Sequence, residues 1–259
     1  MFNKIFEKIK RYRFLFEELV KRDFKQKYKR TVLGMAWSIF SPLLSLLVMR
    51  LVFTQMFGRN TPHYTTYLFC GTLVFSYFRE STTGGMSSLL SNSDIFSKIN
   101  IPKYMFLLSK NVSVFINFLL TLCVFFIFAY IDKITFSWRL LYLLYPIACL
   151  IVFNIGVGLI LSALFVFFRD TRYLYDIFLT VLNYLSVIFY TLNGFSGRIQ
   201  RVFLLNPIYC YIKFFRTVVI DGYLPSLNYH LLCLEYALIA LFVGGIIYKK
   251  YNHRFLYYI

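Results

Sequence analysis

The chain has 259 residues, enough for one ordinary domain, but its composition excludes an ordinary soluble one. Hydrophobic residues make up 59% of the sequence and charged residues 15%, so a globular core of this size could not bury the apolar surface. The formal net charge of +17 would by itself suggest a nucleic-acid partner. However, 11 of the 28 lysines and arginines lie in the first 30 residues and most others flank apolar segments. This pattern indicates a membrane topology and no nucleic-acid partner.

Residues 1–30 are too charged to cross a bilayer and predict an amphipathic helix along its surface. Apolar side chains at Ile5, Ile9, Tyr12, Phe16 and Leu19 are spaced four and three apart, which places them on one helical face. Lysines and arginines fill the other positions, where they would meet anionic headgroups. The alternative is a tail that only sets the topology.

The remainder of the chain, residues 31–259, predicts a transmembrane domain. Its apolar windows are long enough for transmembrane helices of about 20 residues. The predicted fold is all-α and integral to the membrane, with six spans at residues 35–57, 64–90, 105–131, 140–168, 174–193 and 229–248. The fourth window is overlong, which predicts kinks at Pro146, Asn154, Gly156 and Gly158 or an end outside the bilayer.

Charge distribution predicts the orientation of these spans. With both termini inside, the inner segments carry 19 lysines and arginines and the outer segments carry 7. Both termini are therefore expected to be cytoplasmic.

Two connecting segments carry secondary structure of their own. Residues 92–104 are polar and charged, and predict a short cytoplasmic helix that Ser93 or Asp94 caps and Pro102 ends, with a plain cytoplasmic loop as the alternative. Residues 195–222 contain two short amphipathic stretches around Pro207. They are too short to cross, so they predict a re-entrant pair of half-helices on the outer side, with a surface hairpin as the alternative.

Motifs for catalysis and for metal binding are missing from the sequence. It contains no GxxxxGK[ST] loop, DxD pair, Ser-His-Asp set or HExxH motif, and its three histidines are isolated. We therefore expect no enzyme activity and no metal site on this chain.

Four ionisable residues and many aromatic ones fall inside the predicted spans. Arg50, Arg79, Glu80 and Glu235 mark functional positions, because intramembrane charge is expensive. Arg50 and Glu235 could pair across helices or reach the interface by snorkelling. Aromatic residues make up 21% of the chain, and those that line an interior path would suit a glycan, since sugar rings stack their C–H faces on aromatic rings.

Residues 22–53 resemble the opening of the membrane subunits of type-2 ABC transporters that export O antigen, capsule and teichoic acid. The shared positions are Arg22, Asp23, Lys25, Tyr28, Leu33, Gly34, Trp37 and Pro42. Three later segments agree in order: SKINIPKY at 97–104, FFRDTRYL at 167–174 and LLNPIYCYIKFFR at 204–216. The pairs Arg79-Glu80 and Gly84-Gly85 depart from the family pattern.

The resemblance implies a homodimer in the inner or plasma membrane of a bacterium, with two separate ATPase subunits. ATP and Mg²⁺ would be bound by those partners, and this chain would bind no cofactor. The implied cargo is a polysaccharide on a polyprenyl pyrophosphate lipid, moved from the cytoplasm to the outer face. Residues 92–104 would be the coupling helix and residues 195–222 the outer gate.

Four sets of candidate residues follow from this resemblance. Clustered cations that could bind the lipid pyrophosphate are Lys25, Lys27, Lys29 and Arg30. Rings that could contact the glycan are Trp37, Phe40, Tyr77 and Tyr184, the first two being three apart and so on one helical face. Residues for ATPase coupling are Asp94, Phe96, Lys98, Ile99 and Lys103, with Arg169 and Asp170 in a second docking turn. Residues of the outer gate are Asn206, Pro207 and Arg216.

Two other classes of membrane protein remain alternatives. A proton- or ion-coupled secondary carrier should show inverted repeats and midplane acids. An integral membrane glycosyltransferase should show an acidic metal-binding pair. Genomic neighbours would separate them, because an adjacent P-loop ATPase favours the exporter.

Overall fold

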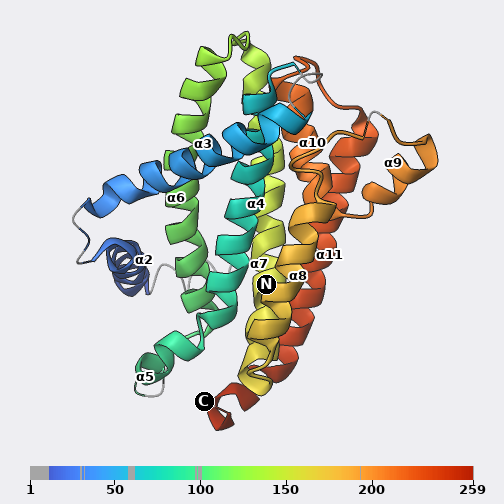
Figure 1. Cartoon of the computed structure of the whole chain (residues 1–259). Coiled ribbons are helices and arrows are strands. Elements are labelled where there is room, and N and C mark those ends of the chain that lie inside the picture. Colours follow the sequence, from blue (N-terminus) through green and yellow to red (C-terminus); the bar gives the residue numbers. More distant parts are fainter. Residues whose placement is uncertain are drawn as a thin grey trace.

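The computed structural model describes residues 12–29, 31, 33–57, 62–96, 98, 101–192 and 194–258. Within these ranges the secondary structure is helical, without a strand. Four long helices run side by side as a bundle (Figure 1): α4 (Tyr64–Ser87), α6 (Tyr104–Ile131), α7 (Leu144–Phe167) and α11 (Leu227–Tyr251). Helices suit such an apolar chain because each satisfies its own backbone hydrogen bonds.

Helix α4 forms the centre of the bundle. It packs against α6, α7, α3 (Trp37–Phe57) and α10 (Pro207–Val219), and most of its side chains are buried. Leu68, Cys70 and Val74 are fully covered. These four helices are therefore arranged around α4.

Helix α3 runs obliquely across the bundle (Figure 1). A short 3₁₀ turn, η1 (Gly34–Ala36), leads into it, and Gly34 has a φ of +52°. This left-handed conformation costs a glycine little because it has no Cβ atom. The turn lets the chain leave α2 (Arg13–Tyr28) and change direction into α3.

Helix α2 packs against protein with part of its predicted apolar face. Leu19 is buried against Met105 and Phe106 at the start of α6, and Tyr12 and Phe16 pack around them. Ile5 and Ile9 lie outside the described residues. The contact with α6 fixes the position of α2 on the bundle.

The two ends of the bundle differ in what they carry. Helix α5 (Ser93–Phe96) and the C-terminal turn η5 (Arg254–Tyr257) lie at one end, which we call the α5 end. Helix α9 (Gly197–Phe203) and the start of α11 lie at the other, the α9 end (Figure 1).

Length and hydropathy identify fewer membrane-spanning helices than the sequence predicts. Among the residues that the structure describes, three helical segments are long and apolar enough to cross a membrane: Tyr104–Ile131, Trp138–Phe167 and Leu227–Tyr251. A fourth is reached if α9 and α10, bent by 109° at their break, count as one span. The six-span topology therefore remains a prediction, because α3 is counted only as a shorter apolar helix over Trp37–Val52 and α8 has 15 residues.

Helix α8 (Thr171–Leu185) has 15 residues and ends before the predicted boundary at residue 193. The chain from residue 186 to 192 is irregular and largely buried. Val187 has a φ of +55°, which is rare for a β-branched residue. The end of α8 is thus a break in the interior and not a helix continuing to the surface.

The overlong fourth window is divided at its beginning. A 3₁₀ helix, η4 (Trp138–Leu143), precedes α7, and Pro146 occupies the first turn of α7, where it is tolerated. The predicted kink residues Gly156 and Gly158 serve close packing. A Cβ atom on Gly156 would lie 2.4 Å from the backbone of Ala240 in α11, and one on Gly85 would lie 3.3 Å from Cα of Gly158. Small residues therefore let α7 approach both α11 and α4.

Substituting Gly156→Ala is expected to destabilise the fold, because the new methyl group would overlap the backbone of α11. Overpacking of this kind typically costs about 1–3 kcal/mol. The thermal unfolding midpoint of the purified protein in detergent measures the loss. Gly245→Ala is the matched control, since a Cβ atom at Gly245 meets nothing within 4 Å. Equal midpoints for the two variants would contradict the close approach.

Candidate functional site

A groove of about 820 Å³ lies between α3, α4, α6 and α8. We call it the main groove. Its polar lining residues are Thr31, Ser38, Ser41, Ser45, Thr72, Ser76, Arg79, Glu80, Asn117, Thr121, Thr180 and Asn183. In a chain of this hydropathy so many hydroxyl and amide groups on one surface indicate contact with water or with a polar ligand.

Helical spacing explains how α3 supplies its part of this lining. Ser38, Ser41 and Ser45 are three and four residues apart, so they share one face of an otherwise apolar helix. Thr72 and Ser76 do the same on α4. This serine stripe could have been recognised in the sequence, but the sequence prediction for the path considered aromatic residues alone.

Helix α8 is held beside α4 by a buried hydrogen bond. The hydroxyl group of Tyr175 donates to Oγ1 of Thr82 at 2.6 Å, and Thr82 donates to the carbonyl of Phe78 at 2.7 Å. Because buried polar groups strongly favour such partners, this pair fixes one wall of the main groove.

Three of the four predicted ring residues line the main groove. They are Trp37, Tyr77 and Tyr184. The fourth, Phe40, does not appear in the lining and is 45% exposed, so it does not share the groove-facing side of α3 with Trp37. Sequence reasoning missed Phe118, which lines the main groove with its ring centroid 4.5 Å from that of Tyr77.

A second hollow of about 570 Å³ continues from the main groove toward α2. We call it the α2 branch. It shares five lining residues with the main groove: Ser76, Arg79, Glu80, Val114 and Asn117. Its other lining residues are Asp23, Gln26, Thr83, Gly84, Lys110 and Ser113. The two hollows are therefore parts of one polar surface.

The predicted pyrophosphate cations that the structure describes lie away from both hollows. Lys25 and Lys29 are exposed and line neither. Arg30 and the side chain of Lys27 lie outside the described residues. From α2, the branch is lined by Asp23 and Gln26, which are three residues apart on another face of the helix.

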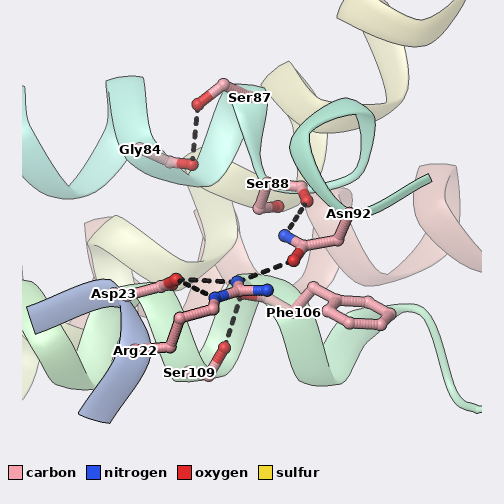
Figure 2. Close-up of polar contacts among 8 residues, drawn as sticks. All are labelled: Arg22, Asp23, Gly84, Ser87, Ser88, Asn92, Phe106 and Ser109. Carbon is pink, nitrogen blue, oxygen red and sulfur yellow. Dashed lines mark hydrogen bonds and ion pairs between the residues drawn. The ribbon is translucent and has the colours of Figure 1, made fainter. Parts of the chain in front are cut away.

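A polar clasp ties α2 to the beginning of the predicted coupling segment (Figure 2). Nη2 of Arg22 donates to Oδ1 of Asn92 at 2.7 Å and lies 2.7 Å from Oδ1 of Asp23. The amide of Asn92 in turn donates to the carbonyl of Ser88 at 2.7 Å. We call these four residues the α2 clasp. It links the helix along the predicted interface to the turn that leads into α5.

The predicted coupling residues occupy different environments. Asp94 and Lys98 are exposed. The side chain of Phe96 and the whole of Ile99 lie outside the part of the chain that the structure describes. Lys103 donates from Nζ to the carbonyl of Asn252 at 2.8 Å, and burial lowers the pKa of its ammonium group. Lys103 therefore joins the coupling segment to the C-terminal segment.

The second predicted docking turn, between α7 and α8, lies at the same end of the chain's fold. Arg169 and Asp170 are both exposed there. Nη2 of Arg169 lies 3.5 Å from the carbonyl of Tyr258, beside the C-terminal turn. Both predicted docking sites therefore adjoin the C-terminal segment.

Asn206 joins the end of α8 to the start of α10. Its Oδ1 accepts a hydrogen bond from the backbone N–H of Ile208 at 3.0 Å. Pro207 begins α10 and has no backbone N–H that would need an acceptor there. Its amide nitrogen donates to the carbonyl of Leu185 at 3.2 Å and to the hydroxyl of Ser186 at 3.1 Å. One side chain thus caps α10 and satisfies the broken end of α8.

The guanidinium of Arg216 is buried among carbonyl oxygens. It donates to the carbonyls of Val187 at 2.8 Å, Ile188 at 3.0 Å and Tyr67 at 3.2 Å. Its Cζ atom lies 3.4 Å from the ring centroid of Tyr67. A Cβ atom on Gly71 would lie 3.0 Å from Nη2 of Arg216, so a glycine leaves room for this approach. We call Asn206, Arg216 and their acceptors the α10 anchor.

Apolar helices of membrane-spanning length place the described chain in the class of multi-pass membrane proteins. Residues 15–220 match the family described as "ABC-2 type transporter". The chain therefore belongs to the ABC-2 type transporter family.

Named relatives cover the chain almost completely. The chain is 28% identical over 248 residues to an O-antigen export system permease protein RfbA from Klebsiella pneumoniae, covering 93% of this chain and 95% of the relative. It is 25% identical to the protein of the same name from Myxococcus xanthus, with 97% and 98% covered. It is also 25% identical to the polysialic acid transport protein KpsM from Escherichia coli, with 90% and 92% covered.

Arg216→Lys is expected to lower the stability of the chain. A lysine ammonium has three donors in a compact head and cannot reach the carbonyls of α4 and the α8 end together, nor stack on Tyr67. Hydrogen bonds to a charged group contribute about 1.5–3 kcal/mol each, so the loss should be of this order. The thermal unfolding midpoint in detergent measures it. Arg201→Lys, on the exposed surface of α9, is the control, and an equal effect of both would contradict the anchor.

Ser41→Cys and Ser76→Cys are expected to react with a charged, water-soluble thiol reagent, because the main groove is polar and hydrated. Val48→Cys, 60% exposed on the apolar side of α3, and Val74→Cys, fully buried, should not react. The background needs Cys123 replaced, because this native cysteine is exposed while the other four are buried. Mass spectrometry of labelled protein measures the reaction. Labelling at Val48 but not at the serines would show that the groove is not the hydrated path.

Proposed function

We propose that this chain is the permease subunit of an ATP-driven exporter that moves a lipid-linked polysaccharide from the cytoplasm across the inner or plasma membrane of a bacterium. The observation that carries the proposal is the main groove, whose hydroxyl, amide and aromatic lining runs between helices of an apolar bundle. The full-length similarity to O-antigen export permeases and to a polysialic acid transport protein supports it.

The chemistry of the main groove suits a sugar chain. Hydroxyl and amide groups such as those of Ser41, Asn117 and Asn183 can exchange hydrogen bonds with sugar hydroxyls. Trp37 and Tyr184 present rings on which the C–H faces of sugars can stack. Among the described lining residues of the main groove, Arg79 and Glu80 carry formal charge. A neutral, hydroxylated polymer would therefore pass without strong binding at any single position.

A second copy of the chain would complete the path. The groove is bordered by α3 and α8, and α8 buries one face while exposing the other. The exposed apolar residues of α8 are Tyr173, Leu174, Ile177, Phe178, Val181, Tyr184 and Leu185. We propose that a partner copy covers part of this face and closes the groove, while lipid covers the remaining apolar surface.

Energy would come from a separate P-loop ATPase in two copies, which binds ATP and Mg²⁺. The sequence has no phosphate-binding loop of its own. The ATPase would dock at the α5 end, on α5 and on the turn that holds Arg169 and Asp170. The α2 clasp would then transmit the movement of α5 to α2. This assignment makes the α5 end cytoplasmic, which agrees with the cytoplasmic termini that the charge distribution predicts.

The outer gate and the N-terminal cations have roles in the same scheme. The α10 anchor, with Asn206, Pro207 and Arg216, would hold the gate helices at the outer side. Lys25, Lys27, Lys29 and Arg30 would attract the anionic lipid carrier to the cytoplasmic entrance of the path.

Deletion of the gene in its host is expected to remove one surface glycan and to leave its lipid-linked precursor inside the cell. The wild-type gene should restore export. Phe96→Asp should insert and be stable but should neither restore export nor co-purify a P-loop ATPase, because the charge would disrupt an apolar contact of α5 with its partner. Phe136→Asp, an exposed site at the α9 end, is the matched control and should export normally. Extracted surface glycan on gels and affinity purification are the measurements.

Two outcomes would contradict the proposal. An unchanged set of surface glycans in the deletion strain would remove the assigned function. Export that stops when an ionophore collapses the ion gradient, while cellular ATP is maintained, would favour a secondary carrier.

A further inference from the structure

Two cations of the α2 branch lie on neighbouring helices and face the same hollow. Arg79 comes from α4 and Lys110 from α6, and both line the branch. A charged side chain within a membrane bundle is costly, so its retention requires a partner. Neither cation forms an ion pair with an acidic residue of the described chain.

Gly84 leaves room for the side chain of Lys110 against α4. A Cβ atom on Gly84 would lie 3.1 Å from both Cγ and Cε of Lys110. The aliphatic stem of Lys110 therefore rests against the bare backbone of α4. This contact holds the lysine across the gap between α4 and α6, on the side that carries Arg79.

The acidic residues of the branch lining are Asp23 and Glu80. Asp23 is already bound by Arg22, with an N–O distance of 2.7 Å. Glu80 lines both hollows and is the remaining acid among the described lining residues. The branch also offers hydroxyl donors, among them Oγ1 of Thr83, which is buried and has no hydrogen-bond partner in the described structure.

We propose that the α2 branch is an anion subsite in which Arg79 and Lys110 bind the diphosphate group of the lipid carrier, with Thr83 as a further donor. The inference rests on the proposed function and names the part of the cargo that binds here. Two cations that line one hollow can together meet the charge of a diphosphate. An acidic polymer would need cations at intervals along its path, and Arg79 is the cation among the described lining residues of the main groove. Arg79 and Gly84, which belong to the pairs that depart from the family pattern, thereby acquire a shared role.

Binding to the purified permease–ATPase complex in lipid nanodiscs tests the subsite. The probes are undecaprenyl diphosphate without sugar, undecaprenyl monophosphate, and polysialic acid without lipid. The double variant Arg79→Gln/Lys110→Gln is expected to bind undecaprenyl diphosphate at least tenfold more weakly than the wild type. Gly84→Ala, which displaces the lysine stem, should weaken binding in the same direction. Arg50→Gln removes an exposed cation of α3 outside both hollows and should leave binding unchanged.

A charge-preserving double variant, Arg79→Lys/Lys110→Arg, separates charge from folding, because it should retain binding whether or not the glutamine variant is stable. Wild-type affinity for undecaprenyl diphosphate in the glutamine variant would overturn the inference. A loss of binding confined to polysialic acid would also overturn it and assign the cations to the polymer.

Glycan export by the wild-type complex is measured in parallel. Its failure would count against the proposed function, whereas normal wild-type export with unchanged binding in the variant would count against the subsite alone.

Discussion

The buried guanidinium of Arg216 makes the irregular part of this fold possible. Backbone carbonyls that leave a helix inside an apolar bundle need donors, because no water is available to replace the lost helical bonds. Arg216 supplies them to Val187 and Ile188 at the broken end of α8, and Asn206 supplies another to Leu185. Helix α8 can therefore stop within the bundle, and α10 can enter it.

The α10 anchor also affects the lining of the main groove, because it holds the end of α8. Since α8 ends early and is tied to α4 through Tyr175 and Thr82, its polar residues Thr180 and Asn183 face the serine stripe of α3. Close packing through Gly156 and Gly244 keeps α7 and α11 together on another side of α4. The groove is polar on one side of α4 while the remainder of the bundle is tightly packed and apolar.

Polar contacts at the α5 end join elements that are distant in sequence. The α2 clasp connects Arg22 to Asn92, and Lys103 connects the start of α6 to the C-terminal segment at Asn252. The α2 branch lies beside these contacts, with Asp23 in both the clasp and the branch. A displacement of α5 would therefore act on the walls of the same hollow for which we propose diphosphate binding.

Composition and apolar periodicity alone determined that the chain is helical and belongs in a membrane, because a lipid environment permits few alternatives for a sequence this apolar. Local signals in the sequence likewise predicted the helices α6 and α11, the short segment around Asp94 and the pair of helices divided at Pro207.

The early end of α8 could not be predicted from the sequence, because it depends on Arg216, which is 29 residues from its acceptor Val187. The placement of Arg79 and Lys110 on one hollow and the outward position of Phe40 were also decided by tertiary structure. The spacing of residues shows which of them share a helical face. Which neighbour that face meets depends on close contacts such as those at Gly84 and Gly156, and these contacts join residues that are far apart in the sequence.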